Sequence, residues 1–127
     1  MQAWQPAGIS LNSPLGMGEQ MKIKYGHSMI KSLNDKNIRT VEFDEKDLPD
    51  SIIQIIKTHP AFSSSSTFGQ KGLGNPQEYE ILIITDDNGT RQFDYFNKGI
   101  YYMLKGDKAE QPVFQVFANL MTLFKNE

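Results

Sequence analysis

Residues 79–85 constrain the fold of this chain more than any other part of its sequence. They read Tyr-Glu-Ile-Leu-Ile-Ile-Thr, with large apolar residues at consecutive positions. Such a run places apolar side chains on both faces of a strand, which is typical of a strand inside a sheet and not at its edge. We therefore expect these residues to form the central strand.

The four residues after this run predict a hairpin turn. Residues 86–89 read Asp-Asp-Asn-Gly, and Asn-Gly is the pair that most readily adopts the positive φ angles of a two-residue turn. Residues 90–96 then return as the partner strand. We therefore expect residues 79–96 to form an antiparallel hairpin at the centre of the fold.

Two further strands are predicted before this hairpin. Met21, Ile23 and Tyr25 alternate with polar residues, which indicates a half-buried strand over residues 21–25. Residues 38–43 are rich in β-branched and aromatic types and predict a second strand. The two are close in sequence, so we expect them to be antiparallel neighbours.

Two segments have the apolar spacing of amphipathic helices. The first begins at residues 47–51, where Asp and Pro are typical of a helix start, and stops before Pro60. The second spans residues 112–125, and its apolar face is wide enough to pack on a sheet. The stripes are Leu48, Ile52, Ile55 and Ile56 in the first helix and Val113, Val116, Phe117, Leu120 and Phe124 in the second.

The remaining segments are predicted to be loops. Residues 27–37 follow the first strand, and residues 61–77 are rich in Ser and Gly. The length of the second loop is unusual for a compact domain, which predicts that it is either mobile or functional. Within residues 97–111, the apolar stretch at 100–103 fits either a short edge strand or a packed loop.

Together these patterns predict a single α+β domain over residues 21–127. We expect an antiparallel sheet of about four strands with two helices packed on one face. Residues 1–20 show no period of 2 or 3.6, and four of them before Met17 are Gly or Pro. They predict an irregular N-terminal arm or a leader.

Composition excludes several classes of function. The 127 residues carry a net charge of −2, whereas nucleic-acid binding requires a basic face. The absence of cysteine excludes disulfides, zinc–thiolate sites and cysteine nucleophiles. No run approaches the roughly 20 apolar residues that cross a bilayer, and residues 1–20 lack the basic region and the unbroken apolar region of a standard secretory signal. We therefore expect a cytoplasmic chain, monomeric when free, that binds neither nucleic acid nor membrane.

Residues that commonly carry catalysis occur only in isolation. His27 and His59 lack metal-ligand spacing. The glycines at 69–74 fit neither phosphate-binding motif, since a strand and not a helix follows them. The acidic residues at 44–50 and 86–87 lie at a helix start and a turn, where Asp has structural roles. We expect no catalytic residue, no metal and no cofactor.

The order of segments resembles a known family. From Met21 the chain reads MKIKY, then RTVEFDEKDLPDSIIQII, then EYEILIITDDNGTRQFDYF, and it ends with an apolar helix. Over roughly residues 21–125 this order resembles the emfourin family. The shared features are the strand RTVEFD, the Leu-Pro helix start, Phe62 after that helix, and a tyrosine-led strand that runs into a hairpin.

Emfourins are small bacterial protein inhibitors of thermolysin-like zinc metallopeptidases. The resemblance therefore implies an inhibitor that blocks the active-site cleft of such an enzyme, a cleft that prefers bulky apolar side chains beside the zinc. One departure follows the first strand, where many emfourin-like sequences carry a Gly-Gly-Phe type of segment. Here that place reads GHSMIKSLNDKN, with Gly26 as its one glycine.

The predicted loop at residues 27–37 contains our candidate partner-binding residues. Met29, Ile30 and Leu33 are apolar where a loop is normally polar, so they either anchor a protein partner or fold back onto the sheet. The full set that we predict to bind the partner is His27, Ser28, Met29, Ile30, Lys31 and Leu33.

Two alternatives accompany this hypothesis. An immunity-like or antitoxin-like protein, which neutralises a different enzyme by steric binding, needs the same small acidic scaffold, and its neighbouring genes would distinguish it. An enzyme is the third class, which the scarcity of His and the absence of Cys oppose. A deep polar pocket with converging titratable groups would favour the enzyme. For binding, the loops at 63–76 and 97–111 are further contact candidates.

Overall fold

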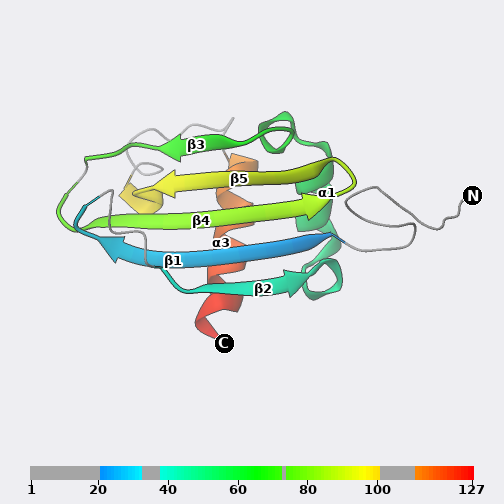
Figure 1. Ribbon diagram of the computed structural model, residues 1–127, viewed down its shortest axis with the longest axis horizontal. Coiled ribbons are helices and arrows are strands. Elements are labelled where there is room, and N and C mark those ends of the chain that lie inside the picture. The colour runs from blue at the N-terminus through cyan, green and yellow to red at the C-terminus, as the bar shows by residue number, and fades with distance from the viewer. Residues whose placement is uncertain (1–20, 33–37, 73, 101–110) are drawn as a thin grey trace, which may run out of the picture.

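The computed structural model describes residues 21–32, 38–72, 74–100 and 111–127. These residues form a sheet and a layer of two main helices (Figure 1). In chain order the elements are β1 (Lys22–Ile30), β2 (Thr40–Asp44), α1 (Asp50–Thr58), β3 (Ser66–Gly69), β4 (Gln77–Asp86), β5 (Gly89–Phe96) and α3 (Gln111–Lys125). Two short 3-10 helices, Glu45–Asp47 and Pro60–Phe62, flank α1.

The strands form one sheet in the order β2-β1-β4-β5-β3. β4 lies at its centre, which confirms the prediction for residues 79–85. Neighbouring strands are antiparallel except β3, which runs parallel to β5. The sheet is therefore mixed and has five strands, where the sequence predicted about four antiparallel ones.

Both helices cover the same face of the sheet (Figure 1). Phe117 of α3 is fully buried, and its ring packs edge-on against Tyr25 of β1 and Tyr95 of β5. Ile53 and Ile56 of α1 join the same core. The predicted α+β class, with two helices on one face, is confirmed.

The apolar run of β4 is divided between the two faces of the sheet, since successive strand residues point in opposite directions. Leu82 and Ile84 are fully buried under the helices, whereas Ile81 and Ile83 are half-buried on the open face. Ile81 packs there against a second, smaller cluster. Its buried members are Ile30, Tyr79 and Phe96.

The loop predicted at residues 27–37 is wrong in its first part, because β1 continues to Ile30. All nine residues of β1 pair with β4, and Ile30 lies opposite Gln77. Polar residues interrupt the alternation on which the prediction relied. The strand continues because Ile30 buries its side chain against Tyr79 and Phe96, which are distant in sequence.

The loop predicted at residues 61–77 also contains regular structure. It begins with a 3-10 helix and includes the edge strand β3. Phe68 of β3 stacks on Phe93, with ring centroids 6.2 Å apart, and lies 5.7 Å from the ring of Tyr95. One aromatic side chain therefore holds this Ser-rich and Gly-rich segment against the core.

Some predictions concern residues outside the described ones. These are the arm at residues 1–20, Leu33, and the stretch at 101–110. Within the described residues, no helix is long and apolar enough to cross a membrane.

Candidate partner-binding surface

Three segments that the sequence assigned to loops meet at one end of the sheet. β1 finishes there with Ile30 opposite Gln77, the first residue of β4. β5 finishes beside it with Phe96 opposite Tyr79, and β3 finishes with Gly69 opposite Phe96. We call this region the loop end, and it comprises the described residues of 27–32, 38–39, 69–80 and 96–100.

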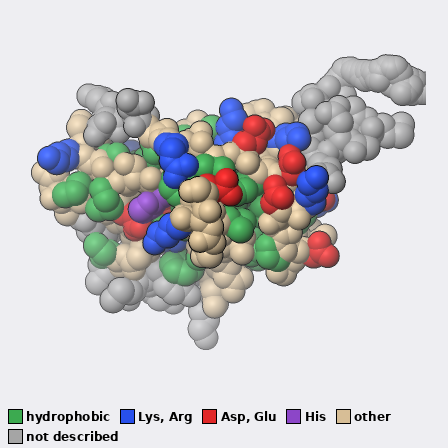
Figure 2. Space-filling view, turned by 90° about the horizontal axis from the view of Figure 1, so that it is seen from below, with side chains coloured by type: hydrophobic (Ala, Val, Ile, Leu, Met, Phe, Trp, Pro, Cys, Tyr) green, Lys and Arg blue, Asp and Glu red, His purple; other side chains and the backbone are tan. Residues whose placement is uncertain are grey.

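Two large hydrophobic side chains are exposed at the loop end. Among the described residues, Met29 is 53% exposed and Ile100 is 50% exposed. Met29 is the register partner of Glu78, and Gly99, the residue before Ile100, donates its amide to the carboxylate of Glu78 at 3.4 Å. In Figure 2, hydrophobic side chains and a histidine are visible toward the end of the molecule where β1 finishes.

Hydrogen bonds hold the backbone beneath these two side chains. The amide of Asn97 donates to the carbonyl of Glu78, and the Asn97 side chain donates to the carbonyl of Gln70. His27 Nε2 lies 3.0 Å from the carboxylate of Glu78, and this bond is the main reason why the pKa of Glu78 is lowered. The exposed side chains therefore project from a backbone that is held in place by hydrogen bonds.

The predicted partner-binding residues differ in accessibility. Met29 and Lys31 are exposed, and His27 and Ser28 are half-buried. Ile30 is only 3% exposed, because it points to the opposite face from Met29 and packs in the second cluster. Of the alternatives that the sequence left open, Ile30 therefore folds back onto the sheet, and Met29 is accessible to a partner.

A buried acidic group lies beneath the loop end. Glu80 of β4 is fully buried, and one carboxylate oxygen accepts a hydrogen bond from the hydroxyl of Tyr25. The other oxygen lies 3.6 Å from Nζ of Lys98, which is buried over the ring of Phe114 in α3. Burial raises the pKa of Glu80 to about 7, although Lys98 and the Tyr25 hydroxyl act in the opposite direction.

This carboxyl makes the stability of the fold depend on pH. Glu80 binds its proton more tightly in the folded chain than in the unfolded chain. The stability that this provides is fully present below the unfolded pKa of 4.5, and it is lost as the pH rises through the folded pKa of about 7. We expect Glu80→Gln to remove that loss. Between about pH 5 and pH 8, the wild type should lose about 1–3 kcal/mol of unfolding free energy relative to the variant.

Urea denaturation at several pH values measures this difference. Because the variant leaves Lys98 beside a neutral amide, its stability can differ from that of the wild type at every pH, so the readout is the slope of each curve against pH and not its height. Glu42→Gln, at an exposed position of β2, is the control and should follow the wild type. Parallel curves for wild type and Glu80→Gln would show that Glu80 is ionised throughout.

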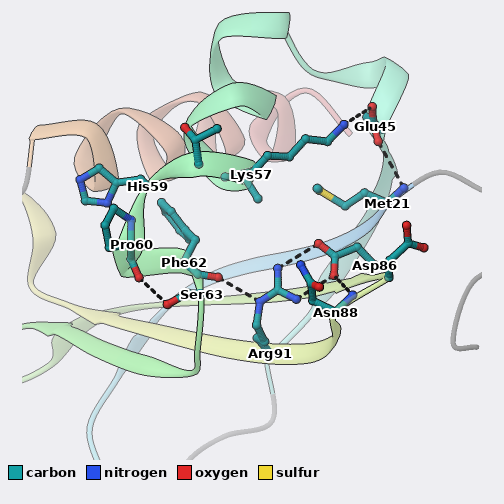
Figure 3. A pocket seen from close by; sticks show the side chains of 13 residues that line it. Met21, Glu45, Lys57, His59, Pro60, Phe62, Ser63, Asp86, Asn88 and Arg91 are labelled. Carbon is teal, nitrogen blue, oxygen red and sulfur yellow. Dashed lines mark hydrogen bonds and ion pairs between the residues drawn. The ribbon is translucent and has the colours of Figure 1, made fainter.

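A cavity of about 630 Å³ lies at the opposite end of the sheet, between the end of α1 and the β4–β5 turn (Figure 3). Arg91 donates to both carboxylate oxygens of Asp86, which lowers the pKa of that carboxyl, and Arg91 also donates to the carbonyl of Phe62. Lys57 pairs with Glu45 at 3.2 Å. These four charged groups of the cavity are thus bonded in pairs.

The uncharged polar groups of the cavity also bond within the fold. The ring of His59 accepts a hydrogen bond from the amide of Ala61, and the hydroxyl of Ser63 donates to the carbonyl of Pro60. A serine nucleophile requires a base within reach of its hydroxyl. Among the described lining residues, Ser63 and His59 are not bonded in that way, so these contacts stabilise the turn after α1.

Within the part of the chain that the structure describes, no three His, Asp or Glu side chains come close enough to hold a metal ion. Comparisons with protein-family models, with curated proteins and with solved structures find no match to this chain. Hypotheses about its function therefore rest on its own residues. The loop end is the candidate surface, because it holds the two exposed large hydrophobic side chains among the described residues.

Proposed function

We propose that this chain is a protein inhibitor that binds, without reacting, in the active-site cleft of a thermolysin-like zinc metallopeptidase. The observation that carries the proposal is the exposure of Met29 and Ile100 on the same end of the sheet. The resemblance of residues 21–125 to the emfourin family supplies the class of target. A cleft that accepts bulky apolar side chains suits these two residues.

The rigidity of the loop end supports this role. A partner-binding side chain on an ordered backbone loses less conformational freedom on binding than one on a flexible loop. Met29 lies in a strand that pairs with β4 along its whole length, and Gly99, beside Ile100, bonds to Glu78. Both side chains are therefore presented in nearly fixed positions before the partner arrives.

The proposal includes what the chain does not do. It has no catalytic activity and needs no cofactor, because inhibition by occupation of a cleft requires only complementary contacts. We also propose that the free chain is a monomer, that it acts in the cytoplasm, and that its partner is a protein and not a nucleic acid or a membrane.

The test is the residual activity of several thermolysin-like metallopeptidases against a peptide substrate, with and without the chain. We expect inhibition that saturates near one chain per enzyme, with the chain recovered uncleaved after incubation. Failure against all of the enzymes, including any encoded beside this chain, would remove the proposal. A neutraliser of a different enzyme, of the immunity type, would then take its place.

A further inference from the structure

Charge is distributed unevenly along the strand direction. The loop end contains four cations, Lys31, Arg39, Lys71 and Lys98, and two carboxylates, Glu78 and Glu80. The opposite end, around α1 and the β4–β5 turn, contains four cations and six carboxylates. These are Lys22, Lys46, Lys57 and Arg91, and Asp44, Glu45, Asp47, Asp50, Asp86 and Asp87.

Accessibility makes the loop end more positive than its formal charges alone indicate. At the loop end, Glu80 is buried and Glu78 is bonded to His27, whereas Lys31 and Lys71 are exposed. At the other end, three of the six carboxylates are exposed, Asp47, Asp50 and Asp87, together with the cations Lys22, Lys46 and Lys57. Acidic side chains are mostly visible toward that end in Figure 2, with basic ones among them. The formal charges of residues 33–37 and 101–110 each sum to zero, so they do not offset the difference.

We propose that the loop end recognises an acidic surface of its protein partner, one in which carboxylates surround apolar pockets for Met29 and Ile100. This inference rests on the proposed function and specifies the chemistry of the cleft that the chain enters. Lys31 follows β1 two residues after Met29, and Lys71 lies over the ring of Phe96 at 5.2 Å. Lys31 therefore lies close to Met29 along the chain, whereas Lys71 lies over the face of the sheet to which Phe96 and Ile30 point.

The physical role of such charges is to orient the encounter. Opposite potentials on two surfaces accelerate association and select the productive orientation, and the effect declines as salt screens the charges. The acidic opposite end contributes to the same effect, because an acidic partner repels it. The molecule therefore approaches an acidic cleft with its loop end first.

The experiment uses a thermolysin-like metallopeptidase that the wild-type chain inhibits. It measures the rate at which the chain associates with this enzyme at low and at high salt. The variant Lys31→Glu with Lys71→Glu reverses two of the three exposed cations at the loop end and leaves Arg39, which lies over the ring of Phe124, in place. We expect its association rate to fall about 10–100-fold at low salt and the difference to shrink at high salt. Lys31→Gln with Lys71→Gln should show a smaller loss of the same kind.

The matched control changes the net charge equally at other exposed positions, with Lys46→Glu and Lys125→Glu. It should lose no more than about 3-fold. If the wild type inhibits and the loop-end and control variants associate equally fast, the charge inference fails and the proposed function stands. If the wild type inhibits none of the enzymes, both fail together.

A membrane is the competing class of acidic surface, and vesicles distinguish it. The wild type is mixed with vesicles of phosphatidylcholine containing phosphatidylserine, and co-sedimentation is measured. Absence of binding supports an acidic protein surface as the partner. Binding that disappears in Lys31→Glu with Lys71→Glu would overturn the inference in favour of an anionic lipid surface.

Discussion

Phe117→Ala is expected to lower the free energy of unfolding by about 3–5 kcal/mol. Phe117 is fully buried in α3 and touches the sheet at its centre. Its ring lies 5.0 Å from that of Tyr95, 6.2 Å from that of Phe68 and 6.3 Å from that of Tyr25. Truncation leaves a cavity between three strands and a helix, and interiors packed at this density collapse only partly around such a void.

Urea unfolding of the wild type and the variant at one pH measures this loss. Gln115→Ala, an exposed position in the same helix, is the control and should change stability by less than about 0.5 kcal/mol. A loss below about 1 kcal/mol for Phe117→Ala would mean that α3 packs on the sheet through other residues.

The central part of this fold was predictable because its signals are local. The Asn-Gly turn and the apolar run before it define the β4–β5 hairpin from consecutive residues. The stripes of α1 and α3 repeat at the period of a helix, so each helix is visible without knowledge of its partner. Patterns of this kind can be recognised from the sequence alone, because each element buries one face regardless of which element packs against it.

The C-terminal half of β1 and the whole of β3 were not predictable in this way. Gly26 weakens the local strand signal, yet the fold requires glycine there, since a Cβ would lie 2.5 Å from the carbonyl oxygen of Arg39. β3 has a single large apolar residue, Phe68, whose packing depends on four rings from elsewhere in the chain, those of Phe62, Phe93, Tyr95 and Phe117. Both strands are fixed by contacts that are distant in sequence.

The candidate surface shows the same division. Met29 was selected because it is apolar in a predicted loop, but it is accessible because of its phase in a strand. The same phase places Ile30 in the core. Ile100 lies in the segment 97–111 that the sequence offered only as a further contact candidate, because the apolar stretch at 100–103 does not show which of its side chains is exposed. The burial of Glu80 with Lys98 was equally hidden, because it depends on the register of β4 and the position of α3.

Met29→Ala combined with Ile100→Ala is expected to weaken inhibition of a thermolysin-like metallopeptidase by about 10–1000-fold. Apolar side chains that fill pockets at the centre of an interface typically contribute more than about 1–2 kcal/mol each. Because both residues are at least half exposed in the free chain, their truncation removes little from the core. The double variant should therefore unfold at nearly the same urea concentration as the wild type.

Two controls separate binding from folding in this experiment. Gln54→Ala, on the exposed side of α1 at the opposite end of the molecule, should change neither inhibition nor stability. Ile30→Ala removes a neighbouring apolar residue that is 3% exposed, so it should lower stability by about 2–5 kcal/mol while the folded fraction still inhibits.

If the Met29 and Ile100 variant inhibits as strongly as the wild type, the inhibitor function survives and the contact surface lies elsewhere on the chain. If Ile30→Ala is fully folded under the assay conditions and still fails to inhibit, the buried orientation of Ile30 does not persist in the complex. The end of β1 would then separate from the sheet when the partner binds.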